Sequence, residues 1–327
     1  MIVDGLDPAA IGQAADRLAA GEPVAFATET VYGLGARADD DAAVAKVFAL
    51  KGRPAAHPLI VHVADRAGAE AFAVAPLSPL AERLLDAFWP GPLTVIVARR
   101  PGMAAAAAGG QATIGLRCPA HPVAHALLAA AAQRGVAGVA APSANRFGRV
   151  SPTTAAHVAA EFGADLLVLD GGACRVGIES AIVDCTGDRP VLLRPGVLTD
   201  AAIETAAGLP LAAADAASPR APGTLASHYA PEATVRLMSG PMLRAALDLL
   251  GSEAIELAVY SRSVPSGVAP GARHRRMPAR PEQAAHELFS VLRELDAGGA
   301  HLIWVEEPPP GPEWAGVRDR LHRAAAK

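Results

Sequence analysis

The sequence predicts an α/β fold divided between two domains, and three observations support this prediction. Short apolar segments alternate with amphipathic helical stretches along most of the 327 residues, as in sheets covered by helices. The length corresponds to about two domains of ~150 residues each. A stretch rich in Ala, Pro, Ser and Gly, residues 209–231, lacks this alternation and separates the two parts. We therefore expect domains at 1–208 and 232–327, joined by a linker at 209–231.

The first domain is expected to form a twisted, mixed, open sheet with helices. Its predicted strands cover residues 23–28, 59–63, 93–98, 113–117, 136–141, 166–169, 181–184 and 191–193. Its predicted helices cover residues 42–51, 78–88, 122–134 and 153–162. Asp39 or Asp40 would cap the first of these helices, because a short polar side chain accepts from free N–H groups there. Ser78 and Pro79 form a similar helix start, with serine as cap and proline in the first turn.

The second domain repeats the alternation on a smaller scale and predicts a small, doubly wound, Rossmann-like α/β domain. Its predicted strands cover residues 234–237, 255–260 and 301–305, and its predicted helices cover 242–250, 282–295 and 316–325. The strongly basic segment 271–276 is expected to be a solvated loop.

Composition limits the classes of function that the chain can have. Hydrophobic residues make up 51% and aromatic residues only 4%, so Ala, Val and Leu must fill the cores. A net charge of −4 gives no general nucleic-acid signature, so any site for a polyanion must be local. Cys118, Cys174 and Cys185 form no CxxC pair, which fits a reducing cytoplasm without a zinc site. No apolar run reaches the ~18 residues of a membrane helix, and the start resembles no signal peptide. We expect a soluble, cytoplasmic protein.

A cationic turn, Lys51-Gly52-Arg53-Pro54, stands out because lysine is scarce: the only lysines are Lys46, Lys51 and Lys327. The turn lies between a predicted helix and a predicted strand. Glycine lets the backbone approach a ligand, and the two cations are expected to point outward toward an anion. The alternative is a solvated turn at a helix C-terminus, where cations interact favourably with the helix dipole.

Several other motifs do not predict a site of their own. Segment 33–38 matches the GxGxxA dinucleotide fingerprint, but polar residues separate it from the preceding strand and no acidic residue follows at the right distance. The chain contains no Walker GxxxxGK[ST] motif. His121 and His125 are four residues apart, but packing or surface placement is expected without a nearby glutamate or third ligand. Ser143 lacks the GxSxG elbow of a serine hydrolase.

Polar side chains gather at or just after the ends of predicted strands, where open α/β sheets form ligand crevices. They are Thr30, Lys51, Arg53, His62, Arg117, Ser143, Asn145, Ser151, Ser180 and Arg194. The set is cationic and hydroxylic, and carboxylates are few, chiefly Glu29, Glu179 and Asp184. This profile fits an anionic substrate held by positioning and charge neutralisation. It does not suit glycoside hydrolysis, which needs a carboxylate pair.

Five ordered motifs resemble the YrdC-like family, and the two-domain length resembles its longer form, the threonylcarbamoyl-AMP synthases of tRNA modification. They lie at 28–35, 51–62, 88–94, 141–145 and 193–196, and the resemblance resumes at 228–231. It implies the joining of L-threonine, bicarbonate or CO2, and ATP into threonylcarbamoyl-AMP with release of pyrophosphate. It also implies Mg²⁺ brought by ATP without a protein-ligated metal site, downstream tRNA-modification proteins as partners, and weak or indirect tRNA contact.

The resemblance also assigns roles to residues of this sequence. Thr30, His62, Arg117, Ala141 and Ser180 match the family's threonine-binding positions. The ATP-binding positions are matched by Arg53, His57, Thr113, Ser143, Ser151, Arg194 and, in the linker, Tyr229. Lys51 and Arg53 are the expected catalytic cations, which would neutralise the polyphosphate. His57 stands where the family usually has asparagine, and Ala27 where it usually has proline.

Two other interpretations stay open from the sequence. YrdC-like domains can present a basic concave face, so the chain could be an RNA-binding module, although its charge balance and few aromatic residues argue against this. It could also be a relative that handles another carbamoyl-adenylate. The linker is expected to act as a lid that keeps water from a reactive mixed anhydride.

Overall fold

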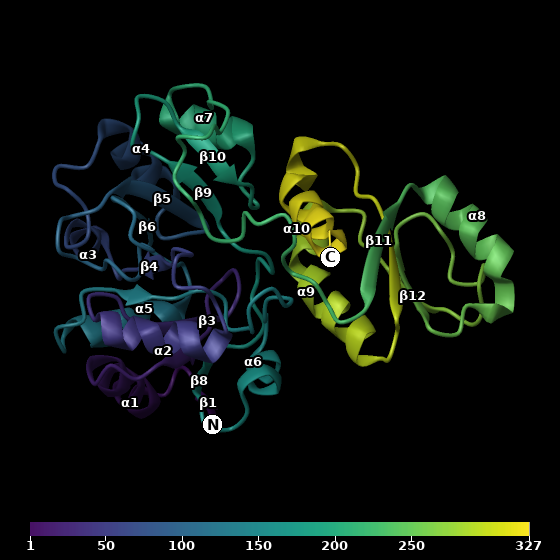
Figure 1. The fold of residues 1–327 in the computed structure, drawn as a ribbon, viewed down its shortest axis with the longest axis horizontal. Helices are drawn as coiled ribbons and strands as arrows, with labels where there is room; N and C mark the ends of the chain where they lie inside the picture. The colour runs from purple at the N-terminus through teal and green to yellow at the C-terminus, as the bar shows by residue number, and fades with distance from the viewer. Residues whose placement is uncertain (327) are drawn as a thin grey trace. The chain divides into compact units, whose positions relative to one another are not determined.

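The computed structural model describes residues 1–326 of the chain and divides into two compact units (Figure 1). The N-terminal unit comprises Met1–Phe147 and Ser151–Thr224, and the C-terminal unit comprises Gly148–Val150 and the chain from Leu225 onward. The division falls inside segment 209–231, so part of that segment belongs to each unit. No helix among the described residues is long and apolar enough to cross a membrane.

The strands described in the N-terminal unit form one mixed sheet in the order β1-β8-β2-β3-β7-β4-β6-β5-β9-β10. Their bounds are Ile2–Asp4 (β1), Val24–Phe26 (β2), Gly33–Arg37 (β3), Ile60–His62 (β4), Leu93–Ala98 (β5), Thr113–Arg117 (β6), Val139–Ala140 (β7), Leu167–Asp170 (β8), Ala181–Asp184 (β9) and Val191–Arg194 (β10). Strand β4 pairs in parallel with β6, and β5 pairs in parallel with β9. Antiparallel pairs join β5 to β6 and β9 to β10. The predicted mixed α/β sheet is confirmed.

Helices cover both faces of this sheet. They are α1 (Pro8–Ala19), α2 (Asp41–Lys51), α3 (Arg66–Glu70), α4 (Pro79–Phe88), α5 (Pro122–Ala132), α6 (Ala155–Phe162) and α7 (Asp200–Ala207). Helices α1 and α5 pack together in one core with β2 and β8, while α2, α4, α6 and α7 contribute to a larger core. Asp40 and Ser78 cap α2 and α4 through their side chains, as the sequence predicts.

The supposed dinucleotide fingerprint at 33–38 turns out to contain a strand, since Gly33–Arg37 is β3, between β2 and β7. Its second glycine serves packing. A Cβ on Gly35 would lie 2.5 Å from Val139 Cγ1 and 2.8 Å from Phe26 Cε1. The motif therefore does not have the strand-to-helix geometry that binds a pyrophosphate.

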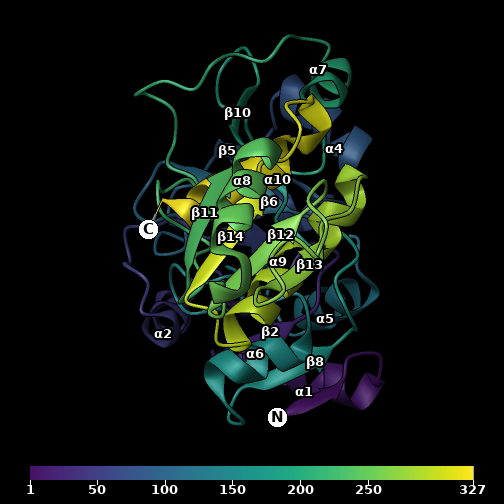
Figure 2. The same ribbon diagram turned by 90° about the vertical axis from the view of Figure 1, so that its right-hand side faces the viewer.

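In the C-terminal unit the described strands form a fully parallel sheet in the order β11-β14-β12-β13. Their bounds are Thr234–Met238 (β11), Leu257–Ser261 (β12), Arg273–Arg276 (β13) and Leu302–Glu306 (β14). Helix α8 (Gly240–Leu250) covers one face, and α9 (Pro281–Ala297) and α10 (Ala315–Ala325) cover the other (Figure 1). Figure 2 shows α8 in front of these strands. Short 3-10 turns occupy Gly251–Glu253 and Pro312–Trp314.

The expectation of a loop at 271–276 is wrong. Residues Arg273–Arg276 form the edge strand β13, which pairs in parallel with Ala258–Ser261 of β12. Arg273, Arg275 and Arg276 are exposed. Exposed charge on an edge strand discourages pairing with other chains, so the structure gives this basic segment a role in the sheet.

Candidate active site

The first part of the site is a tight turn that follows β2. Thr28 Oγ1 donates to Val31 O at 2.6 Å and accepts from the N–H groups of Thr30 and Val31, each at 3.2 Å. The same hydroxyl lies 2.9 Å from Thr30 Oγ1. Val176, in the loop between β8 and β9, donates its N–H to Glu29 O at 2.7 Å. The turn thus fixes where the side chains of Glu29 and Thr30 lie.

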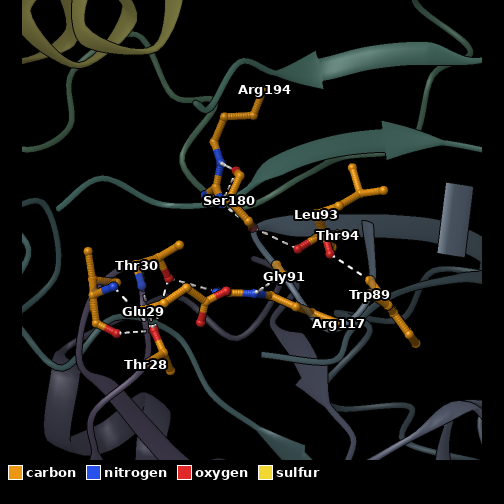
Figure 3. A network of polar contacts seen from close by, with 11 residues as sticks. Thr28, Glu29, Thr30, Trp89, Gly91, Leu93, Thr94, Arg117, Ser180 and Arg194 are labelled. Carbon is orange, nitrogen blue, oxygen red and sulfur yellow. Dashed lines mark hydrogen bonds and ion pairs between the residues drawn. The ribbon is translucent and has the colours of Figure 1, made fainter. Parts of the chain in front are cut away.

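Arg117, the last residue of β6, is the centre of the site (Figure 3). Its Nη1 donates to Thr30 Oγ1 at 2.8 Å and its Nε donates to Gly91 O at 3.2 Å. Its Nη2 forms an ion pair with Glu29 Oε1 at 2.6 Å, and both side chains are only 4% exposed. No other hydrogen-bond partner reaches Nη2 or the Glu29 carboxylate among the described residues. These contacts fix the guanidinium of Arg117 and leave some of its N–H groups able to donate to a further acceptor.

His62 ends β4 and lies beside Arg117 in the parallel pairing of β4 with β6. It is buried, and its Nδ1 has no hydrogen-bond partner among the described residues. Burial and the neighbouring Arg117 charge lower its pKa from 6.5 to about 3. The imidazole is therefore neutral near pH 7, and one buried ring nitrogen is open to a ligand.

A second group forms where β9 begins and β10 ends. Arg194 donates from Nη2 to Ser180 O at 2.9 Å and to Ser180 Oγ at 3.2 Å, and from Nε to Ser180 O at 3.1 Å. Thr94 Oγ1 lies 2.8 Å from Ser180 Oγ (Figure 3). Sequence reasoning gave Thr94 no role, although it belongs to the motif at 88–94. The hydroxyl of Ser180 is fixed from both sides.

Lys51 and Arg53 do not point outward, which corrects the expectation for this turn. They are 3% and 8% exposed, because the loop after Ser143 covers the end of α2. Lys51 Nζ donates to Ser143 O at 2.5 Å and also to Asn145 O. Burial, and then the charge of Arg53, hold the pKa of Lys51 well below its ordinary value. Arg53 Nη2 donates to Pro58 O at 2.9 Å, and its guanidinium lies over the Phe147 ring.

The other expected site residues occupy neighbouring or separate places. Ala141 follows β7, and its N–H donates to Ile60 O at 2.9 Å. Ser151 Oγ donates to Glu179 Oε1 at 2.5 Å. The ring of His57 meets that of Phe147 edge-on at 5.4 Å, and burial followed by the Arg53 charge lowers its pKa. Tyr229 belongs to the C-terminal unit, where its ring stacks on Phe289 at 5.4 Å.

Part of the connecting segment packs onto the N-terminal unit. Arg220 N donates to Gln111 Oε1 at 2.9 Å, and Arg194 Nη1 donates to Pro222 O at 3.0 Å. Ala221 is buried against the side chains of a small apolar cluster, Ile60, Ile96 and Ile182. The space left beside Thr94 and Thr113 is a cavity of about 10 Å³, room for one water molecule. The segment thus covers the sheet beside Ser180.

The donor set for a metal is poor. No group of three or more His, Cys, Asp or Glu side chains that could hold a metal ion occurs among the described residues. His121 caps α5, since its Nδ1 accepts from Val123 N at 3.3 Å. What the site offers is buried cations, hydroxyls and open nitrogens, which suit carboxylate and phosphate groups.

Comparisons with known proteins agree with this chemistry. Residues 16–196 match the family described as "Telomere recombination" (Sua5, YciO and YrdC), and residues 197–326 match "Threonylcarbamoyl-AMP synthase, C-terminal domain". The chain is 37% identical to the threonylcarbamoyl-AMP synthase of Pyrococcus abyssi, covering 93% of this chain and 91% of that protein. It is 36% identical to the Bacillus subtilis enzyme of that name, with 96% and 92% covered. The crystal structure of P. abyssi Sua5 complexed with L-threonine superposes with a TM-score of 0.88 at 34% identity, covering 99% of this chain and 97% of that one.

Proposed function

Because the chain belongs to the two-domain Sua5 family of threonylcarbamoyl-AMP synthases, we propose that the site around Arg117 carries out the family's reaction. The protein is an enzyme, a nucleotidyltransferase that makes L-threonylcarbamoyl-AMP from L-threonine, bicarbonate or CO2, and ATP, with release of pyrophosphate. This product is used in threonylcarbamoyladenosine modification of tRNA. The alternative of an RNA-binding module is not favoured, because the relatives that match over nearly the whole chain are named as enzymes.

The observation that carries the site assignment is the guanidinium of Arg117. Two of its five N–H groups are held by Thr30 and Gly91, and Nη2 faces only Glu29. The remaining N–H groups can bind a substrate carboxylate with two hydrogen bonds, a geometry that lysine cannot provide. Neutral His62 and the hydroxyl of Thr30 lie beside Arg117 and would bind the rest of the threonine molecule. Ser180 and Ala141 complete the proposed threonine site.

The nucleotide would bind on the side of the site that carries the other cations. Arg53 and Arg194 suit phosphate oxygens, while Ser143, Ser151, Thr113 and His57 offer hydrogen bonds to the nucleotide. Lys51 remains a proposed catalytic residue, and it holds the Ser143 loop through the carbonyls of Ser143 and Asn145. Tyr229 stays a proposed nucleotide contact. Mg²⁺ would arrive with ATP and be held by the phosphates, since the described residues form no carboxylate cage for it.

The chemistry requires no protein nucleophile. The threonine ammonium first gives up a proton to solvent. The neutral amine nitrogen then forms a bond to the carbon of CO2 and releases a second proton, giving a carbamate anion. A carbamate oxygen then attacks the α-phosphorus of ATP in line, and the bond to pyrophosphate breaks. Buried cations stabilise the negative charge that develops on the departing oxygens. Threonylcarbamoyl-AMP is a mixed anhydride, so it must be protected from water until a downstream protein uses it.

We place this protection in the segment that ends at Thr224. Its contacts from Arg220, Ala221 and Pro222 to the sheet support a lid role. Added together, ATP and threonine should slow proteolysis within 210–224. A chain truncated after Pro210 should lose synthesis or leak hydrolysed product while residues 1–208 stay folded. Full activity in that chain would contradict the lid. The three free, buried cysteines are compatible with the cytoplasm, where we propose that the enzyme works.

One assay tests the proposed function directly. Pyrophosphate release from ATP should depend on both L-threonine and bicarbonate, and threonylcarbamoyl-AMP should appear in equal amount. Pyrophosphate release that needs only one of the two substrates would contradict the proposal.

A further inference from the structure

We propose that Glu29 makes the site around Arg117 selective for a zwitterion, so that the site takes an α-amino acid and rejects the matching α-hydroxy acid. The inference rests on the proposed function, because it concerns the amino-acid side of the same site. It assigns a task to a buried carboxylate that the proposed roles above leave unused.

The contacts of Glu29 show that its carboxylate is committed to one group only. Oε1 lies 2.6 Å from Arg117 Nη2, and the residue is 3% exposed. Apart from that ion pair, no donor among the described residues reaches either carboxylate oxygen. A buried ion pair rarely repays its desolvation unless further hydrogen bonds satisfy the remaining lone pairs. The open oxygen therefore points to a donor that arrives with the ligand.

The two charges in direct contact at this site are opposite in sign. Arg117 contributes a positive charge and Glu29 a negative charge, while His62 is neutral because its pKa is about 3. The thiols near Glu29 are uncharged near pH 7, since burial raises the pKa of Cys118 to about 11 and that of Cys174 to about 12. The remaining histidine that faces Glu29, His121, has its pKa lowered by burial, with Arg175 beyond it. Arg117 and Glu29 therefore present one cation and one anion side by side.

An amino acid complements this pair of charges. Its carboxylate and ammonium are attached to the same carbon, and Arg117 Nη2 and Glu29 Oε1 are adjacent. With the carboxylate on the free N–H groups of Arg117, the ammonium can lie toward the open oxygen of Glu29. An α-hydroxy acid carries a net negative charge and leaves Glu29 facing a neutral hydroxyl, so the buried carboxylate loses its charged partner.

The backbone holds Glu29 in place before the ligand arrives. The Thr28 hydroxyl bonds to the backbone of the turn. The N–H groups of Val176 and Gly177 donate to the carbonyls of Glu29 and Thr30 at 2.7 and 3.2 Å. Such preorganisation favours a selective site, because little ordering is needed when the ligand binds.

The test compares two ligands in matched variants. Calorimetry measures the dissociation constants of L-threonine and of 2,3-dihydroxybutanoate, the analogue with a hydroxyl in place of the amine. The proteins are the wild type, Glu29→Gln, and the control Glu22→Gln, whose carboxylate is 55% exposed and pairs with Lys46. We expect the wild type and the control to prefer threonine by about 10- to 100-fold, the range of one hydrogen bond to a charged group. In Glu29→Gln the two affinities should become similar.

Two outcomes would overturn the inference. If Glu29→Gln weakens both ligands by the same factor, Glu29 only holds Arg117 in place. If the preference for threonine is unchanged, Glu29 does not sense the ammonium. Should Glu29→Gln fail to fold, Glu29→Asp keeps the charge and must keep the preference even if both affinities fall, and its loss would refute the role. Pyrophosphate release by the wild type, measured in parallel, reports separately on the proposed function.

Discussion

The two units are both α/β layers with polar residues at the ends of their strands, yet these residues are partnered differently. In the C-terminal unit the buried carboxylate of Glu306 accepts from Ser261 Oγ at 2.6 Å and from the N–H groups of Arg262 and Ser263, each at 2.8 Å. Arg262 Nη2 adds a further bond at 3.0 Å. In the N-terminal unit the equally buried Glu29 has a single partner among the described residues, Arg117.

The difference shows how a structural polar cluster can be told from a binding site. Burial alone would raise the pKa of Glu306, but hydrogen bonds from Ser261, Ser263 and Arg262 outweigh it and lower that pKa. Such a network satisfies the Glu306 carboxylate and ties the end of β14 to the end of β12. The cluster of Glu29, His62 and Arg117 keeps open polar atoms, which a native protein rarely buries without a ligand.

The largest loss of stability should come from breaking the cluster of Glu29, His62 and Arg117. Arg117→Leu leaves the Glu29 carboxylate buried without a counter-charge, so the free energy of unfolding should fall by about 3–5 kcal/mol. Adding Glu29→Leu should restore most of the loss. In the C-terminal unit, Arg262→Leu leaves Glu306 three other donors and should cost only about 1 kcal/mol. Chemical denaturation of the three variants checks this, and equal losses for Arg117→Leu and Arg262→Leu would remove the distinction between the clusters.

The second prediction compares the loss of a buried lysine with the loss of an exposed lysine in the N-terminal unit. Lys51→Met removes the donor from two carbonyls, those of Ser143 and Asn145, and should cost about 2–4 kcal/mol, since each orphaned buried group costs about 1–3 kcal/mol. ATP binding should also weaken, because the Ser143 loop loses its anchor. Lys46→Met is the matched control, with a side chain 44% exposed and an expected change of about 0.5 kcal/mol. If both variants unfold alike, Lys51 does not hold the loop.

The third prediction concerns pH and His62. Its pKa is about 3 in the folded protein, against an ordinary value of 6.5 for a solvated histidine. The unfolded chain therefore binds the proton first, and stability is full above pH 6.5 and declines as the pH falls toward 3. Between pH 8 and pH 5 this group should cost about 2 kcal/mol of unfolding free energy. His62→Gln should lose that part of the pH dependence, measured by denaturation at both pH values. If the pH dependence of the unfolding free energy is the same in His62→Gln as in the wild type, the pKa of His62 is not lowered in the folded protein.

The smallest effect should come from a single hydrogen bond in the C-terminal unit. The Tyr260 hydroxyl donates to Glu287 Oε1 at 2.9 Å, and Tyr260→Phe should lower the unfolding free energy by about 1 kcal/mol. Threonine affinity should stay as in the wild type. A weaker affinity in this variant would show that the C-terminal unit contributes more to the threonine site than the comparison suggests.

Much of the fold could be predicted from local sequence. Asp40 and Ser78 indicated where α2 and α4 begin, because a cap needs only a short polar side chain a few residues from the free N–H groups. Apolar runs located β5 and β6 for a similar local reason. Strand β3 was missed because its glycines have poor strand propensity, and its packing between β2 and β7 compensates. The edge strand β13 was missed because its arginines resemble a solvated loop.

By itself, the sequence determined the α/β class, the two-part organisation and which polar residues follow the strands. The tertiary structure alone decided what those residues do to one another. Lys51 is buried against carbonyls 92 and 94 residues away. Glu29, in the turn after β2, meets Arg117 at the end of β6 although three strands lie between β2 and β6 in the sheet order. Helix caps and apolar periodicity depend on neighbours along the chain. The burial and pairing of charges depend on strand order and on loops far apart in sequence, and these form only when the whole sheet is assembled.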